Sequence, residues 1–187
     1  MGTQIEIDRK QEIFRELMGA MARPGRLTGI TPSKVGILTD VLDVLLDHEV
    51  VFCVLGENKD LLEKRITAAT GSMPAGIGSA DFVITAACDT GDELYKAKRG
   101  SLEYPDNGAT VIYYSAAPQG NKNNQDFIFK GPGIAPGSGP VSPGIPENEL
   151  KKLSEINSDY PLGLDVVIIS GNSLLCIPRS SKITGVK

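Results

Sequence analysis

The sequence is poor in the side chains that most often hold metal ions. It contains one histidine, His48, and three cysteines, Cys53, Cys88 and Cys176, among 187 residues. No pair of these residues has the spacing of a zinc site, and they do not form an iron–sulfur motif. We therefore expect no metal, and His48, which follows a predicted helix, is interpreted as a structural residue.

The cysteines also argue against a disulfide-stabilised secreted protein. They are odd in number, widely spaced and each set among apolar residues, which predicts buried thiols and a reducing compartment. Residues 1–8 lack a basic region followed by an apolar stretch, and no later run approaches the ~18 apolar residues of a membrane span. The expected protein is cytoplasmic, neither exported nor embedded in a membrane.

A surplus of positive charge is missing as well. Nineteen Lys and Arg stand against twenty-three Asp and Glu, a formal net charge of −4. This balance lacks the long-range positive field that binding to nucleic acid or anionic lipid requires, so neither is an expected partner. The hydrophobic content of 41% is typical of a globular protein. A chain of 187 residues is long enough to close one core, so a single domain over residues 1–187 is expected.

Familiar catalytic motifs are absent. There is no Gly-x-Ser-x-Gly nucleophile turn. The segment 131–134 is rich in glycine, but it lacks the Gly-Lys-Ser/Thr ending of a nucleotide loop, and Pro132 removes an N–H donor that an anion would need. The acidic residues between positions 81 and 93 lie beside predicted short helices, where solvated faces and caps are their ordinary roles. No catalytic, metal-binding or cofactor-binding residue is therefore assigned.

Hydrophobic periodicity predicts alternating helices and strands. Helices are expected at residues 9–22, 35–46, 59–69, 92–99 and 147–156. Strands are expected at residues 50–55, 81–87, 109–115, 127–130, 164–170 and 173–177. An Asp8–Gln11 capping box should open the first helix, and Asn58 should cap the third. Strands 109–115 and 127–130 are expected to be neighbours joined by the polar loop 118–125, and a hairpin should end the chain.

This order favours one architecture. Interleaved helices and densely apolar strands predict an α/β fold, a three-layer α/β/α sandwich whose sheet is mixed because of the terminal hairpin. Segment 131–145 is too dense in glycine and proline for a helix or a central strand, so it is predicted to be a long loop.

Four turns in the sequence are more distinctive than the helix and strand pattern alone. They read MARPG at 21–25, GPGI at 131–134, YPLGLD at 160–165 and IPR at 177–179. Together with FRELM at 14–18, GATVI at 108–112 and LLCIPRSS at 174–181, and in this order and spacing, they resemble the H subunit of the bacterial carbon–phosphorus lyase system, the PhnH family. The resemblance spans nearly the whole chain.

The resemblance implies a fold and a lack of cofactor. The family fold is similar to the large domain of pyridoxal-phosphate (PLP)-dependent transferases, but without PLP. A Schiff-base enzyme needs a lysine held beside an aspartate and a phosphate site. No such constellation stands out around the chain's candidate lysines, which are Lys34, Lys59, Lys64, Lys96 and Lys130. Likeness of fold does not by itself confer the chemistry.

The resemblance also implies partners. The family works in phosphonate breakdown within a complex of G, H, I and J subunits, an α-D-ribose 1-methylphosphonate 5-triphosphate synthase. The complex attaches a phosphonate to a ribose triphosphate derived from ATP, and a radical step on the J subunit later cleaves the carbon–phosphorus bond. For this chain it implies a structural or assembly role in a transferase and lyase complex, no catalysis on its own, and a homodimer in isolation.

Two other readings remain open. In one, the 131–134 turn, through Gly131 and Gly133, binds a triphosphate or phosphonate intermediate at a subunit boundary together with Arg23 or Arg179. In the other, the protein is a free-standing small-molecule binder. Arg23 lies between a helix end and a Pro-Gly turn, and Arg179 follows a proline after the last predicted strand. Both arginines are expected to be exposed on rigid supports, as interface or ligand residues.

Overall fold

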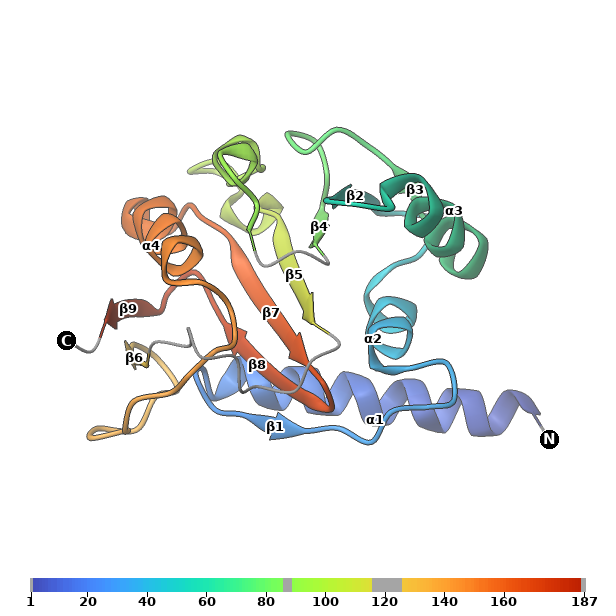
Figure 1. Ribbon diagram of the computed structural model, residues 1–187, viewed down its shortest axis with the longest axis horizontal. Coiled ribbons are helices and arrows are strands. Elements are labelled where there is room, and N and C mark those ends of the chain that lie inside the picture. The colour runs from blue at the N-terminus through green and yellow to red at the C-terminus, as the bar shows by residue number, and fades with distance from the viewer. Residues whose placement is uncertain (1, 86–88, 116–125, 186–187) are drawn as a thin grey trace.

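A mixed sheet of seven strands forms the centre of the molecule (Figure 1). The computed structural model describes residues 2–85, 89–115 and 126–185, with the backbone alone for residues 2–6. The strands are β1 (Thr28–Gly29), β2 (Val51–Leu55), β3 (Met73–Pro74), β4 (Phe82–Thr85), β5 (Thr110–Ser115), β7 (Asp165–Ser170) and β8 (Ser173–Ile177). Their order is β1-β8-β7-β5-β4-β2-β3. From β3 to β7 the neighbours are parallel, whereas β8 is antiparallel to both β7 and β1.

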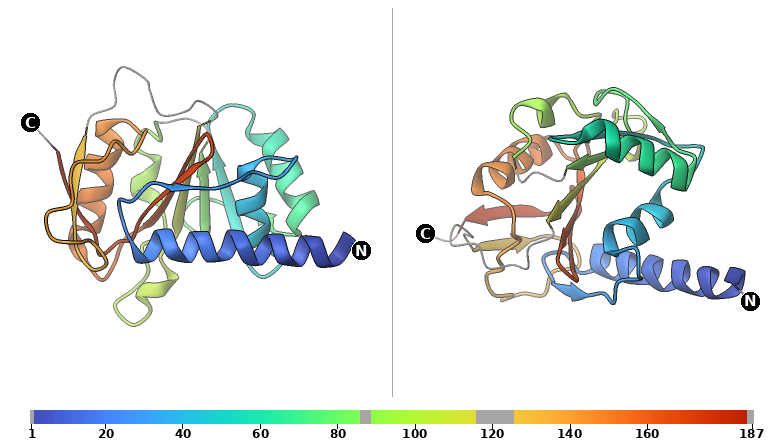
Figure 2. Two further views of the ribbon diagram at one scale, coloured as in Figure 1. Left: turned by 90° about the horizontal axis from the view of Figure 1, so that it is seen from below. Right: turned by 45° about the vertical axis from the view of Figure 1, so that its right-hand side comes forward.

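Helices pack on both faces of this sheet (Figures 1 and 2). The α-helices are α1 (Gly2–Ala22), α2 (Ile37–Leu45), α3 (Lys59–Thr70) and α4 (Glu147–Ile156). Short 3-10 helices are η1 (Glu93–Lys96), η2 (Pro105–Asn107) and η3 (Asn157–Asp159). The apolar side chains of α1, α2 and α3 join one core cluster, and those of α4 join the other.

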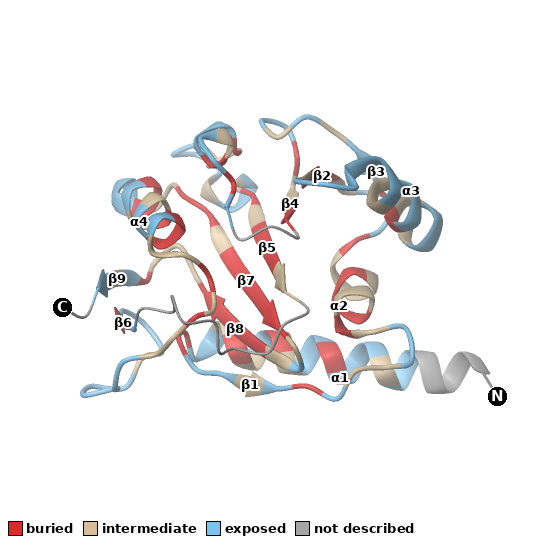
Figure 3. Cartoon of the chain, in the orientation of Figure 1, coloured by how far each residue is buried: buried red, intermediate tan, exposed pale blue. Residues whose placement is uncertain are grey.

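The strands divide their side chains between the two cores, because successive residues of a strand point to opposite faces. In β5, Val111 and Tyr113 belong to the α4 side, and Ile112 lies on the α1–α3 side. The central strands are therefore buried on both faces (Figure 3). This explains why their sequences are apolar runs without polar alternation.

The α/β class and the mixed sheet are confirmed. The predicted helices 35–46, 59–69 and 147–156 correspond to α2, α3 and α4, and the terminal hairpin to β7 and β8. Pattern recognition succeeded for these elements because each one buries an apolar face of its own.

Two predicted helix starts need correction. Helix α1 begins at Gly2, so Asp8 and Gln11 lie inside it and cannot form the box that opens it. Between Thr3 and Met18 no proline or glycine interrupts the chain, which lets the helix extend toward the N-terminus. Asn58 does stand at the start of α3, but its backbone is left-handed, with φ of 60°, and its side chain makes no capping hydrogen bond.

The predicted helix 92–99 is wrong beyond one turn. Only η1 forms, because the backbone that follows it pairs elsewhere. The carbonyl of Lys98 accepts from Ala109 N–H at 2.7 Å, and Arg99 forms a bridge with Gly108. The backbone is already extended at Ala97, with φ of −64° and ψ of 146°, so these residues pair across the loop and do not continue the helix.

The predicted neighbours 109–115 and 127–130 are not adjacent. Strand β6 (Phe127–Lys130) leaves the main sheet and pairs antiparallel with β9 (Lys182–Gly185), which follows the hairpin. The chain therefore does not end with the hairpin, as expected. Two-residue strands β1 and β3 are also additions, too short to carry a periodic signal.

Two of the three cysteines lie within the described residues, and both confirm the predicted buried thiols. Cys53 and Cys176 are buried and free. Burial in the apolar core raises the pKa of Cys176 to about 12. Cys88 and the predicted loop 118–125 lie outside the described residues. None of the described helices is both long and apolar enough to cross a membrane.

Leu17→Ala should lower the free energy of unfolding by about 2–5 kcal/mol, because Leu17 is buried in the core between α1 and the sheet. Leu61 of α3 is 53% exposed, so the same change there, Leu61→Ala, should cost less than about 1 kcal/mol. Urea unfolding followed by circular dichroism measures both. Equal losses would contradict the packing of α1 described above.

Candidate functional site

Three of the four distinctive turns pack against one another at one end of the molecule. The Gly25 N–H donates to the carbonyl oxygen of Cys176 at 3.1 Å, which ties the 21–25 turn to β8. Gly133, with φ of +78°, lies so close to Ala22 that a Cβ would overlap the Ala22 carbonyl oxygen. A Cβ on Gly131 would come within 3.0 Å of the carbonyl oxygen of Ser180. Close approach of backbones is what these glycines permit.

The fourth turn is joined to the others through Arg179. The Asp165 carboxylate accepts hydrogen bonds from Arg179 Nε at 3.1 Å, from Nη2 at 2.5 Å and from the Arg179 amide N–H at 2.8 Å. The guanidinium also donates to the carbonyl oxygens of Pro105 and Gly108. Gly163 packs against the side chain of Asn157, and a Cβ at this position would overlap the Asn157 side-chain oxygen. We call Arg179, Asp165 and the two carbonyls the arginine clamp.

The arginine clamp corrects the expectation for Arg179. Its side chain is 13% exposed, not displayed to solvent, because the β7–β8 register brings it beside Asp165. Arg23 is exposed, as predicted, and no hydrogen bond or ion pair of its side chain appears among the described residues. The structure thus brings Arg23, Gly131 and Gly133 into one neighbourhood and gives Arg179 an internal role.

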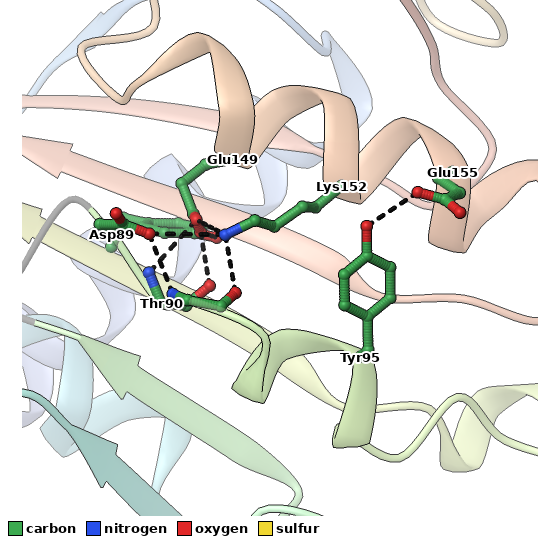
Figure 4. A network of polar contacts seen from close by, with 8 residues as sticks. Asp89, Thr90, Tyr95, Glu149, Lys152 and Glu155 are labelled. Atoms are coloured by element: carbon green, nitrogen blue, oxygen red, sulfur yellow. Dashed lines mark hydrogen bonds and ion pairs between the residues drawn. The ribbon is translucent and has the colours of Figure 1, made fainter.

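A second polar cluster lies beyond the carboxyl end of β4, where α4 contacts the segment that contains Thr90 and Gly91 (Figure 4). Glu149 is fully buried. One of its oxygens accepts from the Thr90 and Tyr113 hydroxyls, each at 2.7 Å, and the other accepts from Lys152 Nζ at 2.7 Å and Thr90 N–H at 3.2 Å. Such a carboxylate is stabilised in the core because its lone pairs are satisfied.

Lys152 completes this cluster. Its ammonium group also donates to the Gly91 carbonyl at 2.7 Å and to Asp89 at 3.4 Å. Burial by itself would lower the pKa of Lys152, but the hydrogen bond and charge of Glu149, aided by Asp89, raise it. The hydrogen bond from the Gly91 N–H is the main cause that lowers the pKa of Asp89; burial opposes it, and the hydrogen bond and charge of Lys152 lower this pKa further. We call Thr90, Tyr113, Glu149 and Lys152 the glutamate latch.

The polar groups of the glutamate latch are bound to one another and to the adjacent backbone. All three hydrogens of the Lys152 ammonium have acceptors within the cluster, so the nitrogen has no lone pair to offer as a nucleophile. In open α/β sheets ligands bind beyond the carboxyl ends of the strands. Here α4 is fixed near this edge to the segment that follows β4.

Sequence reasoning missed the glutamate latch, although a signal was present. Glu149 stands with Leu153 and Ile156 at helical spacing, so it falls on the apolar face of its helix. An acidic residue in that phase points to a buried partner. Among the acidic residues noted earlier, Asp81 accepts from Lys98 at 2.5 Å and from Val51 N–H at 2.9 Å. Within the described residues, no three His, Cys, Asp or Glu side chains are grouped to hold a metal.

Comparison with known families places these turns in context. The family model described as bacterial phosphonate metabolism protein (PhnH) matches residues 1–184. The chain belongs to the PhnH family. A curated relative from Stutzerimonas stutzeri, the putative C-P lyase subunit protein HtxG, is 32% identical over 181 residues, covering 94% of this chain and 86% of the relative.

A second relative of the PhnH family comes from Rhizobium meliloti (strain 1021). It is named alpha-D-ribose 1-methylphosphonate 5-triphosphate synthase subunit PhnH, and is 28% identical over 186 residues, covering 92% of this chain and 89% of the relative. The predicted family membership is confirmed. In this PhnH member the motif glycines have a packing reason: Gly131 and Gly133 allow two backbones to meet, and Gly25 and Gly163 leave room for a neighbouring side chain.

Arg179→Ala should lower the free energy of unfolding by about 2–3 kcal/mol, because Asp165 and two carbonyls lose a charged donor. Arg23→Ala removes no such bond and should stay within about 0.5 kcal/mol of wild type. Arg179→Lys should recover only part of the loss, because an ammonium cannot reproduce the planar fork. Thermal and urea unfolding of the three variants test the arginine clamp; an undisturbed Arg179→Ala protein would refute it.

Glu149→Gln should cost about 3 kcal/mol, because the amide turns a donor toward Thr90 or Lys152 and leaves the lysine without its buried counter-charge. Glu147→Gln, two residues away, is the matched control. Glu147 pairs with Lys151 on the surface, so its loss should cost less than about 1 kcal/mol. Chemical denaturation at neutral pH separates the two variants, and similar values would argue against the glutamate latch.

Proposed function

We propose that this protein is a subunit of a bacterial carbon–phosphorus lyase complex, the α-D-ribose 1-methylphosphonate 5-triphosphate synthase, and supports phosphonate catabolism. The match of the PhnH family over residues 1–184 carries this proposal. Both relatives are named as subunits, and each alignment covers most of the two chains. Residues 1–187 act as one domain in the cytoplasm, with a fold like the large domain of PLP-dependent transferases but without PLP.

The role that we propose is assembly, with the G, I and J subunits as partners. Its support is the way the chain uses its polar groups. The arginine clamp and the glutamate latch are directed inward, and their donors are bound to acceptors of the same chain. A group saturated by structural partners is poorly placed to act as an acid, base or nucleophile.

In isolation we propose a homodimer. A self-complementary apolar patch is the usual basis of a symmetric pair, and α1 offers one. Ile7, Phe14 and Met18 follow each other at spacings of seven and four, which places them along one side of the helix. All three are about half exposed, although the opposite side of α1 is buried in the core.

A second candidate function is binding of a triphosphate or phosphonate intermediate at a subunit boundary. The observation that favours it is Arg23, which is exposed beside the turn of Gly131 and Gly133 and has no side-chain partner in the part of the chain that the structure describes. In this reading Arg179 acts through the arginine clamp, by holding the neighbouring backbone, and does not touch the ligand. The complex, not the isolated chain, would then carry any transferase or lyase activity.

Co-expression with the G, I and J subunits tests the proposal. Tagged wild-type protein should capture the other three in constant ratio through two purification steps, whereas an unrelated tagged α/β protein should capture none. Absence of the three subunits from the wild-type eluate would overturn the assembly role. Binding of a labelled ribose triphosphate by the isolated chain would support a free-standing binder instead.

A further inference from the structure

Acidic residues are missing from three segments of this otherwise acidic chain. No Asp or Glu occurs between Glu16 and Asp40, between Asp126 and Glu147, or after Asp165. The same segments carry the basic residues Arg23, Arg26, Lys130 and Lys182. The net charge of −4 therefore conceals a strong separation of charge along the sequence.

The fold brings these segments together. The 21–25 turn packs against β6, since a Cβ on Gly25 would come within 2.8 Å of the Phe129 ring. Strand β6 ends at Lys130, whose Cα partner in the antiparallel ladder is Lys182 of β9. We call Arg23, Arg26, Lys130 and Lys182 the basic end.

The four cations of the basic end are exposed, and none forms an ion pair or side-chain hydrogen bond within the described part of the chain. Some exposed lysines elsewhere do have carboxylate partners, as in Lys96–Glu93 and Lys151–Glu147, whereas the segments of the basic end contain no Asp or Glu that could serve as one. Lys130 and Lys182 project from the same side of their ladder. Like charges directly opposite one another destabilise a strand pair, so this arrangement has a cost within the isolated molecule.

A hollow adjoins the basic end. It has a volume of about 350 Å³ and lies between the 24–26 turn, β6 and the loop 134–141. Arg26 stands on its lining together with the apolar side chains of Phe129, Ile134 and Val141. Arg26 is the member of the basic end that lines this hollow, and the other three cations lie on the segments next to it. Apolar side chains with charged residues nearby have the composition of a protein interface, in which buried apolar contacts are surrounded by a polar rim.

We propose that the basic end docks an acidic segment of a partner protein, whose carboxylates pair with the four cations and whose apolar side chain enters the hollow. This rests on the proposed function, because the partner is one of the other subunits of the complex. A protein fits better than a free polyphosphate. The cations come from three separate segments, and one of them, Arg26, lines an apolar hollow, whereas phosphate sites converge N–H donors on one point.

Charge reversal at the basic end tests this docking surface. The double variant Arg26→Glu/Lys130→Glu is compared with Lys64→Glu/Arg65→Glu, which makes the same charge change at one exposed lysine and one exposed arginine of α3. Glu at position 130 would face Lys182, so the β6–β9 ladder should be retained. The affinity of each protein for the purified G–I–J subunits is measured between low and high salt.

The basic-end variant should bind at least ~10-fold more weakly than wild type at low salt, with a flatter salt dependence, and the control should bind within about 3-fold of wild type. Equal weakening in both variants, or none in either, would overturn the inference while leaving subunit assembly intact. Failure of wild type to bind G–I–J would overturn both. The inference also falls if charge reversal abolishes binding of a fluorescent ATP analogue but leaves subunit binding unchanged.

Discussion

The ion pair between Arg179 and Asp165 is the contact on which the turn-rich end of the molecule depends. Asp165 opens β7 and Arg179 follows β8, so the pair closes the hairpin at its open end. The remaining donors of the guanidinium hold the carbonyls of Pro105 and Gly108, which precede β5. One planar side chain thus aligns three strands of the sheet, and the glycine turns can pack closely because their supports are fixed.

The glutamate latch performs a corresponding task at the other end of the strands. Glu149 binds Tyr113 of β5 and Thr90 of the segment after β4, so α4 is held against the sheet by charge-assisted bonds as well as by apolar contacts. A buried carboxylate tolerates few alternative arrangements, since a shift of the helix would leave it unsatisfied. Both clusters use ionisable groups to position secondary structure.

Periodicity and punctuation in the sequence were sufficient for the α/β class, the mixed sheet and most elements. Each such element buries an apolar face of its own, and the apolar residues that form this face can be recognised within one continuous segment of sequence. The family could likewise be recognised from the order of turns such as 21–25 and 131–134. Failures occurred where backbone pairing was distant, as for β6, whose partner β9 lies about fifty residues away and displays no alternation.

The sequence by itself determined the architecture, the buried thiols and family membership, because these follow from local composition and spacing. Tertiary structure alone decided what the polar residues do. Arg23 and Arg179 have similar surroundings in sequence, each beside a proline, yet one is exposed and the other is bound to Asp165. The difference arises because the fold places a distant carboxylate, that of Asp165, beside Arg179 and places none beside Arg23 among the described residues. Electrostatic partners are set by three-dimensional proximity, which cannot be inferred from a local sequence pattern.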